Sequence, residues 1–398
     1  MRIVHVQHPF VPGMGYQENH LPAKQRDRGH EVTVLTSDVR PAKFDGKTDA
    51  PFDPGRYEYG GVAVERLPAR FYVGDLDDVL LRGLVGRLRE LRPDVVHSHG
   101  LLSFKTLQTY RYARGSDAKL FVDVHRDNDN FHLDSLYKRA GLAAFRHLFL
   151  PRLLVTADGV LAVNPYAREL VQDRIGVPEN HVQYLPLGVD PASFAPDPEV
   201  REAARERLGV DDSTIVVLTA GHLEPTKDLP ELVRAFGRVG EAVDPELRLV
   251  VVGDGPGEYL DRVRREVESV GHGEAVDFPG FVDHDELADL FNAADVGVWP
   301  GKLGIAAAEG ISTGLPIVVP ETPATDFLVA GDNGIRFPRG DEGALADAIR
   351  RYVEDPDLRA DHSRRGRDLA ESVLSWDAIA DRSLAIYRGE RPPKVGGE

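Results

Sequence analysis

The stretch from Trp299 to Pro316 combines an anion-binding geometry with a single carboxylate. Its sequence predicts the end of a buried strand at 295–298, a loop with two glycines at 300–304 and a short helix at 305–313. A glycine loop that leads into a helix start presents unpaired backbone N–H groups to an anion such as phosphate. Glu309 lies about one turn inside this helix, where its carboxylate can accept hydrogen bonds from ligand hydroxyls. The other interpretation is an ordinary strand–helix unit in which Glu309 is solvated.

A second polar stretch, His125–Asp134, directly follows a predicted strand at 120–124. In open α/β sheets, ligands bind outside the carboxyl ends of the strands. Asp127 and Asp129 have the spacing of a carboxylate clamp for Mg²⁺ or Mn²⁺, which prefer oxygen ligands. His125 is the alternative functional group, because it follows the strand at once and can hydrogen-bond a substrate. A solvated acidic loop is the third interpretation, and all three stay open at this point.

Two further glycines, Gly13 and Gly15, lie in the loop after the first predicted strand. A helix at 17–28 and a second strand at 32–36 complete a βαβ unit of the kind found in nucleotide-binding sheets. The dinucleotide fingerprint is excluded, because no third glycine follows at the required spacing. The pair of glycines therefore indicates either a nucleotide-binding turn or only a tight one.

The composition indicates a soluble protein with two domains. A chain of 398 residues exceeds the usual size of a single core. Cysteine is absent, which excludes disulfides, thiolate metal sites and cysteine nucleophiles. The net charge of −17 disfavours nucleic-acid binding, which needs a basic face. Neither a membrane-spanning apolar run nor a signal peptide is recognisable, so we expect a cytoplasmic location.

The charged residues are biased within each sign. The chain has 39 Asp against 26 Glu and 39 Arg against 9 Lys. Excess Asp, scarce Lys and no Cys suggest a salt-adapted, halophilic host, in which surface carboxylates keep the protein hydrated. A GC-rich genome is the alternative explanation for the preference for Arg over Lys.

Short strands alternate with helices in both halves, which is the pattern of α/β proteins with parallel sheets. We therefore predict two doubly wound, Rossmann-like domains. The first covers residues 1–188 and the second residues 189–372, with the boundary at a proline-rich stretch. A C-terminal helix at 373–390 is expected to cross back to the first domain, and the tail 391–398 is expected to be disordered.

Two helices are predicted in the first half of the chain. Residues 76–91 have helical spacing. Residues 137–152 form a long predicted helix with apolar residues on one side and interspersed basic residues. Such a helix can lie on an anionic membrane surface, or it can pack within the domain with its basic residues solvated.

Several short segments occur in the order seen in the GT-B glycosyltransferases, in particular the retaining, family 4-like group (glycosyl transferases group 1). This group includes glycogen and sucrose synthases and bacterial mannosyltransferases. The matching segments are Pro12–Gly15, Gly29–Thr36, Leu185–Asp190, Gly253–Pro256, Phe278–Phe281 and Asn333–Asp341. Together they extend over nearly the whole chain. The resemblance implies GT-B architecture, in which two Rossmann-like domains face each other across a cleft.

The resemblance also implies a nucleotide-sugar donor held mainly by the second domain. Backbone N–H groups of Gly304, Ile305 and Ala306 would meet the diphosphate. Lys227 is at the position of the family's phosphate-binding lysine, and His222 replaces the family's arginine five residues earlier. Gly13 and Gly15 match the family's first-domain glycine loop, in which Gly15 would approach the diphosphate.

One acidic position of the family differs in this chain. Glu309 matches the second glutamate of the family's Glu-x7-Glu motif, which accepts hydrogen bonds from the ribose hydroxyls. The first glutamate, which contacts the transferred sugar, would fall at Gly301 and is missing. Lys302 beside this gap leads to the hypothesis of an acidic donor sugar such as a uronate.

By the same resemblance, His125 lies beside the donor sugar and Lys227 supports the leaving diphosphate. Family members retain the anomeric configuration, and catalysis consists mostly of phosphate stabilisation and positioning. No metal and no cofactor is required, because backbone amides and Lys227 do the work of Mg²⁺. This argues against a clamp at Asp127 and Asp129.

The resemblance thus implies transfer of a sugar from a nucleotide-diphosphate donor to a hydroxyl acceptor. A lipid-linked or surface-polysaccharide precursor is expected as the acceptor, with peripheral association at the cytoplasmic membrane face. The alternatives are a nucleotide-sugar epimerase of GT-B fold and a noncatalytic protein that binds nucleotide sugars.

Overall fold

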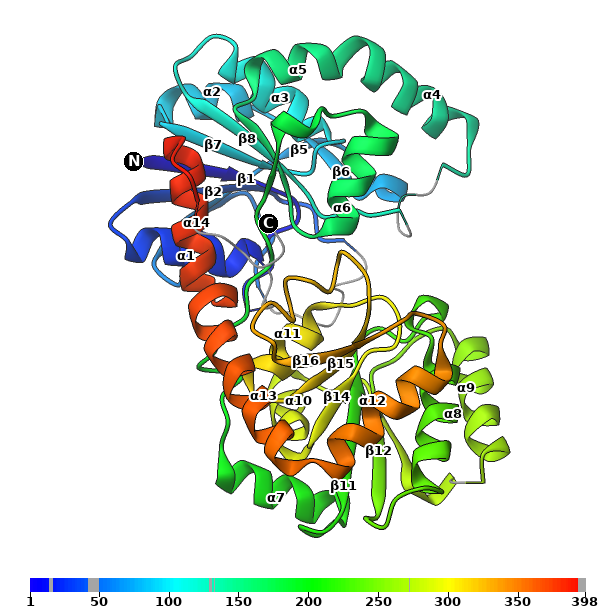
Figure 1. Cartoon of the computed structure of the whole chain (residues 1–398). Helices are drawn as coiled ribbons and strands as arrows, with labels where there is room; N and C mark the ends of the chain where they lie inside the picture. The colour runs from blue at the N-terminus through cyan, green and yellow to red at the C-terminus, as the bar shows by residue number, and fades with distance from the viewer. Residues whose placement is uncertain (14–16, 42–49, 129–130, 132, 272, 393–398) are drawn as a thin grey trace. The chain divides into compact units, whose positions relative to one another are not determined.

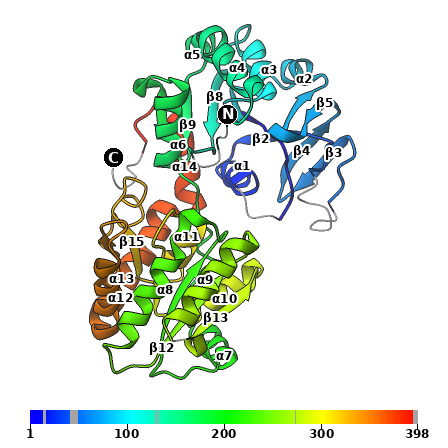
Figure 2. The same ribbon diagram turned by 90° about the vertical axis from the view of Figure 1, so that its right-hand side faces the viewer.

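The computed structural model of the chain describes residues 1–13, 17–41, 50–128, 131, 133–271 and 273–392. The chain divides into two compact units. Among the described residues, unit 1 contains Met1–Leu187 and residues 379–392, and unit 2 contains Gly188–Ala378. Each unit is a parallel-stranded α/β sheet flanked by helices, as Figures 1 and 2 show.

Unit 1 is built on an eight-stranded sheet. Its strands, from edge to edge, are β10 (Val182–Tyr184), β9 (Gly159–Ala162), β8 (Lys119–Val124), β7 (Val95–His99), β1 (Arg2–Val6), β2 (Glu31–Ser37), β4 (Val62–Leu67) and β3 (Gly55–Tyr59). Only β3 pairs antiparallel to its neighbour. The helices are α1 (Gln17–Asp27), α2 (Leu84–Leu91), α3 (Phe104–Ala113), α4 (Leu136–Ala144), α5 (Leu150–Thr156), α6 (Pro165–Glu169) and most of α14 (Trp376–Arg388).

The two faces of this sheet differ in chemistry. Successive strand residues point to opposite faces. On one face, Val4, Val96 and Val122 join an apolar core that includes residues of α2 and α3. The opposite face carries buried histidines and an aspartate, and polar side chains of α1 and α14 meet them there. Figure 1 shows α2 and α3 on one side of β7 and β8, and α1 and α14 on the other.

Unit 2 is built on a six-stranded parallel sheet. Its strands in order are β13 (Val276–Gly280), β12 (Leu247–Val252), β11 (Ile215–Ala220), β14 (Val296–Val298), β15 (Ile317–Pro320) and β16 (Gly334–Phe337). The helices are α7 (Pro198–Leu208), α8 (Leu229–Gly240), α9 (Gly257–Ser269), α10 (His284–Ala293), α11 (Ile305–Ser312), α12 (Glu342–Glu354) and α13 (Pro356–Leu369). Val217 packs into one core with α8, α9 and α12, whereas Val216 and Leu218 pack into a second core with α10 and α11. A sheet that is covered on both faces is doubly wound.

The helix predicted at 76–91 is wrong. The segment Asp78–Leu81 is strand β6, which pairs antiparallel with β5 (Ala69–Val73), and only Leu84–Leu91 is helical. Left-handed backbone at Asp77 and Gly83 interrupts any continuous helix, with φ of 46° and 78°. Hairpin pairing therefore overrides the local helical spacing.

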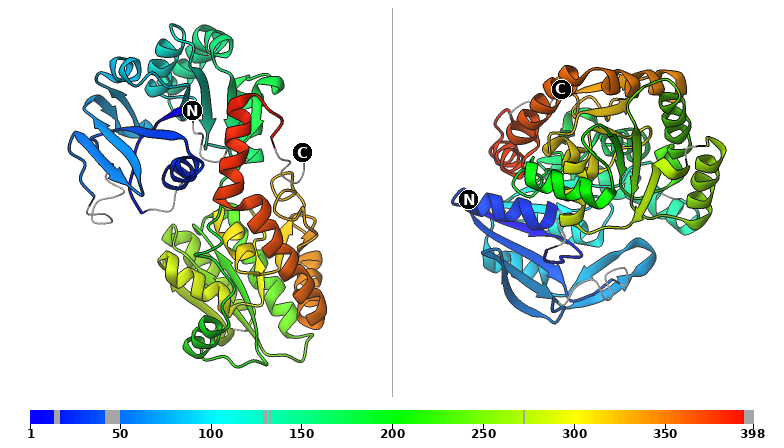
Figure 3. Two further views of the ribbon diagram at one scale, coloured as in Figure 1. Left: turned by 90° about the vertical axis from the view of Figure 1, so that its left-hand side faces the viewer. Right: turned by 90° about the horizontal axis from the view of Figure 1, so that it is seen from below.

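Two other helical predictions need only small changes. The predicted helix at 137–152 is a continuous helical segment from Leu136 to Thr156, in which α4 and α5 are joined by a π-helical turn at Phe145–Phe149. The C-terminal helical region is interrupted at Ser375, whose backbone is extended, so that α14 begins anew at Trp376 (Figure 3). The predicted tail 391–398 lies largely outside the described residues. Among the described helices, none has both the length and the apolar character needed to cross a bilayer.

Candidate active site

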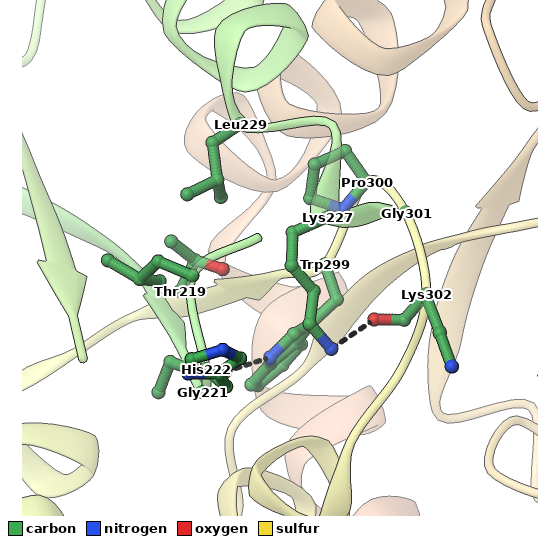
Figure 4. Close-up of a pocket in the computed structure, with 11 residues that line it drawn as sticks. Thr219, Gly221, His222, Lys227, Leu229, Trp299, Pro300, Gly301 and Lys302 are labelled. Atoms are coloured by element: carbon green, nitrogen blue, oxygen red, sulfur yellow. Dashed lines mark hydrogen bonds between the residues drawn. The ribbon is translucent and has the colours of Figure 1, made fainter. Parts of the chain in front are cut away.

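A pocket of unit 2 lies where the strand order reverses, at the carboxyl ends of β11 and β14. It is lined by Thr219, Ala220, Gly221, His222, Leu223, Lys227, Leu229, Trp299, Pro300, Gly301 and Lys302. Figure 4 shows these side chains around the two loops that follow the strands. Ligands of open α/β sheets bind at such a switch point. The indole Nε1 of Trp299 donates to the carbonyl of Ala220 at 2.9 Å, which ties the two loops together.

The start of α11 is open to an anion. Gly304 is its N-cap, and no side chain caps the first N–H groups. The ammonium of Lys227 lies 3.8 Å from the position that a Cβ would take at Gly304. It donates to the carbonyl of Lys302 at 2.7 Å, a bond drawn in Figure 4. A cation and a helix N-terminus therefore lie next to each other, and both attract a diphosphate.

Glu309 is buried inside α11. Burial raises the pKa of its carboxyl group to about 7. The ionisable side chain of His284 on α10 lies beside it, with Nδ1 3.9 Å from Oε1. The spacing of the sequence gave no signal for His284, because it lies 25 residues before Glu309 on another helix. Within the described part of the chain, no side chain donates a hydrogen bond to the carboxyl group of Glu309, and burial dominates its pKa.

Gly301 has a steric explanation. A Cβ at this position would lie 2.2 Å from the carbonyl oxygen of Thr226 and 2.7 Å from the carbonyl carbon of Lys227. The backbone N–H of Lys302 donates to the same Thr226 oxygen at 2.8 Å. The loop around Thr226 therefore occupies the space that a side chain at 301 needs. A glutamate at this position would require the loop to move.

The remaining predicted residues are placed as follows. His222 is exposed at the pocket wall, directly after Gly221, whose φ is 141°. Gly13 has a φ of 75°, which favours glycine, and Gly15 lies outside the described residues. Asp127 is buried, and its partner in the alternative metal clamp, Asp129, also lies outside the described residues, so the structure does not test that alternative.

In unit 1, His125 follows β8 and contacts a buried carboxylate. Its Nε2 is 3.0 Å from Oδ2 of Asp123. Two more histidine nitrogens approach the same oxygen, His99 Nδ1 at 2.6 Å and His97 Nε2 at 3.3 Å. The backbone N–H of Gly100 donates to the other oxygen, Oδ1, at 2.9 Å.

The cluster shifts the pKa values of its members in opposite directions. Burial by itself would raise the pKa of Asp123, but the charges of His99 and His125 and the hydrogen bond of His125 hold it well below its usual range. Burial lowers the pKa of His125, but the charge and hydrogen bond of Asp123 outweigh burial and raise it to about 9. Burial and the neighbouring His99 lower the pKa of His97 to about 4.

Two groups of side chains in the described part of unit 1 have enough ligand atoms for a metal ion. They are His5, His97 and His99, and His99, Asp123 and His125, with the atoms of each group within 4.8 Å of one another. The 2.6 Å contact between His99 and Asp123 is shorter than the roughly 3.3 Å between two ligands of a tetrahedral zinc ion. This distance favours a direct contact without an intervening ion.

The comparisons with known proteins agree with the two-unit fold. Residues 200–369 match the family described as Glycosyl transferases group 1, and residues 13–188 match the Glycosyl transferase 4-like domain. The chain is a group 1 glycosyltransferase of GT-B fold.

Two curated relatives extend along nearly the whole glycosyltransferase. A GDP-mannose-dependent alpha-(1-6)-phosphatidylinositol dimannoside mannosyltransferase of Mycobacterium tuberculosis is 29% identical, over 97% of this chain and 95% of the relative. A glycogen synthase of the same species is 24% identical, over 99% of this chain and 97% of the relative.

Solved structures show the same fold. Sucrose-phosphate synthase from Thermosynechococcus elongatus has a TM-score of 0.70 at 20% identity, with 98% of both chains covered. Anabaena HepE in complex with UDP has a TM-score of 0.71 at 17% identity, over 98% of this chain and 100% of HepE.

Unit 1 contains buried polar groups that were not expected from the sequence. Asp123 was part of a predicted strand and was given no role. A signal was present, because His97 and His99 are two residues apart and therefore share a strand face. The register of β7 against its neighbours then places His5 beside His97 and Asp123 beside His99.

Proposed function

We propose that this glycosyltransferase binds the diphosphate of its donor at the start of α11 and transfers the sugar, with retention, to a hydroxyl of a lipid-linked glycan precursor. One observation carries the donor assignment. The Lys227 ammonium lies beside the uncapped start of α11, and the buried Glu309 lies about one turn further on.

The residues have separate roles in this proposal. Lys227 and the N–H groups of Gly304–Ala306 stabilise the charge that develops on the leaving diphosphate. Glu309 accepts hydrogen bonds from the ribose hydroxyls, and His125 contacts the transferred sugar. His222 adds a single hydrogen bond where an arginine would give a bidentate, permanently charged pair. Neither a metal nor a cofactor has a step in this scheme.

The direct test is incubation of the wild-type protein with a panel of nucleotide sugars and hydroxyl acceptors at low and high salt. Release of nucleoside diphosphate with a glycosylated acceptor is the expected result, and NMR of the product should show the anomeric configuration of the donor. A new nucleotide sugar without acceptor would indicate an epimerase. Tight binding without turnover would indicate a noncatalytic partner, and either outcome would overturn the proposal.

The proposed lipid-linked acceptor has two supports. A relative that aligns along nearly the whole chain is named for mannosyl transfer to a phosphatidylinositol dimannoside. In addition, the helical segment 136–156 carries a surface suited to an anionic membrane. Its exposed arginines and large apolar residues are Leu136, Tyr137, Arg139, Arg146, Leu148, Arg152 and Val155, which we call the basic helix surface.

The basic helix surface differs from the rest of this acidic protein. No Asp or Glu occurs between Ser135 and Ala157, although the whole chain carries a net charge of −17. Leu136, Leu148 and Val155 are 83%, 63% and 89% exposed, and α4 buries none of its residues. Exposed apolar residues next to arginines are typical of a helix that lies at the lipid headgroups.

Vesicle sedimentation tests this assignment. Phosphatidylcholine vesicles with phosphatidylglycerol should bind the protein, and pure phosphatidylcholine vesicles should bind it less. Arg139→Glu combined with Arg146→Glu should remove roughly 1 kcal/mol of binding for each lost arginine. The control pair Arg350→Glu and Arg364→Glu changes exposed arginines of unit 2 and should leave binding unchanged. Equal loss in both double variants would contradict a specific membrane surface.

A further inference from the structure

Six buried side chains from β1, α1, β7, β8 and α14 form a closed ring next to His125. The ring starts at Asp123, whose Oδ2 lies 2.6 Å from His99 Nδ1, and His99 Nε2 lies 3.0 Å from His5 Nδ1. His5 Nε2 is 2.8 Å from Gln25 Oε1, and Gln25 Nε2 is 3.4 Å from the Tyr387 hydroxyl. The Tyr387 hydroxyl is 2.7 Å from His97 Nδ1, and His97 Nε2 closes the ring at 3.3 Å from Asp123 Oδ2. All six side chains are buried. All of them belong to unit 1.

Four of the six contacts are hydrogen bonds. The other two are close contacts of Asp123 Oδ2 with His99 Nδ1 and His97 Nε2, and among the described residues neither nitrogen has a hydrogen-bond partner of suitable geometry. The ring therefore packs two histidine rings against the carboxylate.

Ser383 fixes the orientation of the Gln25 amide. Its hydroxyl donates to the carbonyl of Ala380 at 2.7 Å, so its oxygen accepts from Gln25 Nε2 at 2.9 Å. Gln25 Oε1 then accepts from His5 Nε2. Burial lowers the pKa of His5 well below its usual range, so His5 is neutral and its Nδ1 accepts from His99 Nε2.

Asp123 is a buried carboxylate with two histidine rings of this cluster packed against it. Its oxygen Oδ2 still accepts a third contact, from Nε2 of His125 at 3.0 Å. The side chain of His125 is 35% exposed. Its Nδ1 has no hydrogen-bond partner in the described part of the chain, so it is the nitrogen left for a ligand.

We propose that Asp123 is the positioning residue of His125: it holds Nε2, keeps the imidazole ring protonated and thereby makes Nδ1–H a hydrogen-bond donor to the substrate. The inference rests on the proposed function, in which His125 contacts the transferred sugar. The Asp123 carboxylate is held in place by contacts with His97 and His99 of the ring, with His125, and with the N–H of Gly100. His125 then acts as a donor and not as a base.

The surrounding charges agree with this role. The groups that face His125 are Asp123 on its own strand end, Glu18 of α1 and His99 of β7, whose ring centroid is 6.3 Å away. Both carboxylates raise the pKa of His125, against the effect of burial. Since the pKa reaches about 9, His125 is an imidazolium at neutral pH and loses this form as the pH rises through 9.

The first measurement needs no variant. Imidazole ¹⁵N and ¹³C shifts of His125 in the wild-type protein should report an imidazolium up to about pH 8, and above its pKa the tautomer protonated on Nε2. A neutral His125 at pH 7, or the Nδ1–H tautomer, would overturn the inference. This readout does not depend on turnover, so failure of the proposed function, seen as a lack of product with the wild-type enzyme, remains distinguishable.

The second measurement uses Asp123→Asn. Loss of a contacting opposite charge should lower the titration midpoint of His125 by roughly 1–3 pH units. In the pH profile of turnover, the midpoint of the decline at high pH should move to lower pH by the same number of units. Turnover at neutral pH should fall about 100-fold, as expected for a misplaced group, with little change in nucleotide affinity. A midpoint or a pH profile that does not move would overturn the inference.

Tyr387→Phe is the matched control inside the cluster. It removes one hydroxyl from the ring and leaves the pair of Asp123 and His125 intact. We expect a lower melting temperature with an unchanged His125 titration and an unchanged pH profile. If Tyr387→Phe moves the titration as far as Asp123→Asn does, the effect is a general disturbance of the fold and the positioning role is overturned.

Discussion

Each unit contains one buried carboxyl group at its candidate site, and the two behave in opposite ways. Asp123 of unit 1 has a lowered pKa, because histidines and a backbone N–H surround it. Glu309 of unit 2 has a pKa raised to about 7, because burial acts on it without a compensating contact. Burial alone raises the pKa of a carboxyl group, and the partners decide the outcome. Asp123 has close partners within its own unit, whereas burial dominates at Glu309, as expected if the proposed donor binds there.

The two carboxyl groups also couple stability to pH with opposite signs. The contribution of Asp123 is present above its unfolded pKa and is lost as the pH falls through its lowered folded pKa. The protonated form of Glu309 contributes fully below its unfolded pKa, and this contribution is lost as the pH rises through about 7. Above about pH 7, the ionised form of Glu309 therefore lowers the stability of the fold without ligand.

The largest expected effect comes from replacing His125, which Asp123 contacts. His125→Ala should lower turnover roughly 10²- to 10³-fold, the range for loss of one preorganised hydrogen-bond donor. Affinity for nucleoside diphosphate, measured by calorimetry, should stay within about twofold, because His125 belongs to unit 1 and the diphosphate is assigned to unit 2. The reverse pattern, with normal turnover and weak nucleotide binding, would make His125 a structural residue.

Lys227→Ala tests the anion site of unit 2. Loss of a charged hydrogen bond costs roughly 1.5–3 kcal/mol, so affinity for nucleoside diphosphate should fall about 10- to 150-fold. Binding of the free nucleoside should change little, because it lacks the phosphates. Lys302→Ala is the matched lysine control, since Lys302 contributes its backbone carbonyl and not its side chain to the bond with Lys227. Unchanged diphosphate affinity in Lys227→Ala would contradict the donor site.

Glu309 predicts a pH-dependent donor affinity. Ribose hydroxyls donate more strongly to the ionised carboxylate than to the neutral carboxyl group, so affinity should rise by up to about tenfold per pH unit below about 7 and level off above it. A 2′,3′-dideoxy nucleoside diphosphate should lack this dependence, and Glu309→Gln should abolish it. The same variant should raise the melting temperature of the ligand-free protein at pH 8. Identical pH profiles for the ribose and dideoxyribose ligands would place Glu309 away from the ribose.

Gly301 and Gly304 form a matched pair of glycines in one loop. Gly301→Ala should destabilise the protein by roughly 1–3 kcal/mol, because its Cβ would overlap the backbone near Thr226. Gly304→Ala should cost less, because the nearest atom would be at an ordinary 3.8 Å. Gly301→Glu should lower activity and not restore a family-like donor contact. Thermal melts and turnover of the three variants check this order.

The smallest expected effect concerns donor choice. Lys302 lines the pocket beside Gly301, where the family's sugar-contacting glutamate is missing. If the donor sugar is acidic, Lys302→Ala should reduce the preference for uronate over neutral donors by a few-fold, the size of a partly exposed ion pair. Competition assays with paired donors measure this ratio. An unchanged ratio would remove the acidic-sugar hypothesis.

The sequence was sufficient for what depends on local order. Alternating strands and helices predicted two doubly wound domains, and the glycines before residue 305 predicted the open start of α11. The helix at 76–91 failed, because the pairing of Asp78–Leu81 with β5 is a tertiary contact that overrides local spacing. The sequence also showed that a glutamate is missing at Gly301, but not that the backbone of a loop 75 residues earlier fills the space.

The sequence by itself determined the fold class, the family and the candidates Lys227, His125 and Glu309. These inferences need only hydrophobic periodicity and short segments, which depend on local residue order. Only the tertiary structure decided their chemistry. The ring that fixes Asp123 draws on residues from His5 to Tyr387, which are brought together by strand register and by the C-terminal helix. The charge on a carboxyl group depends on what surrounds it in three dimensions, so Asp123 and Glu309 acquire opposite pKa shifts that no spacing along the chain could predict.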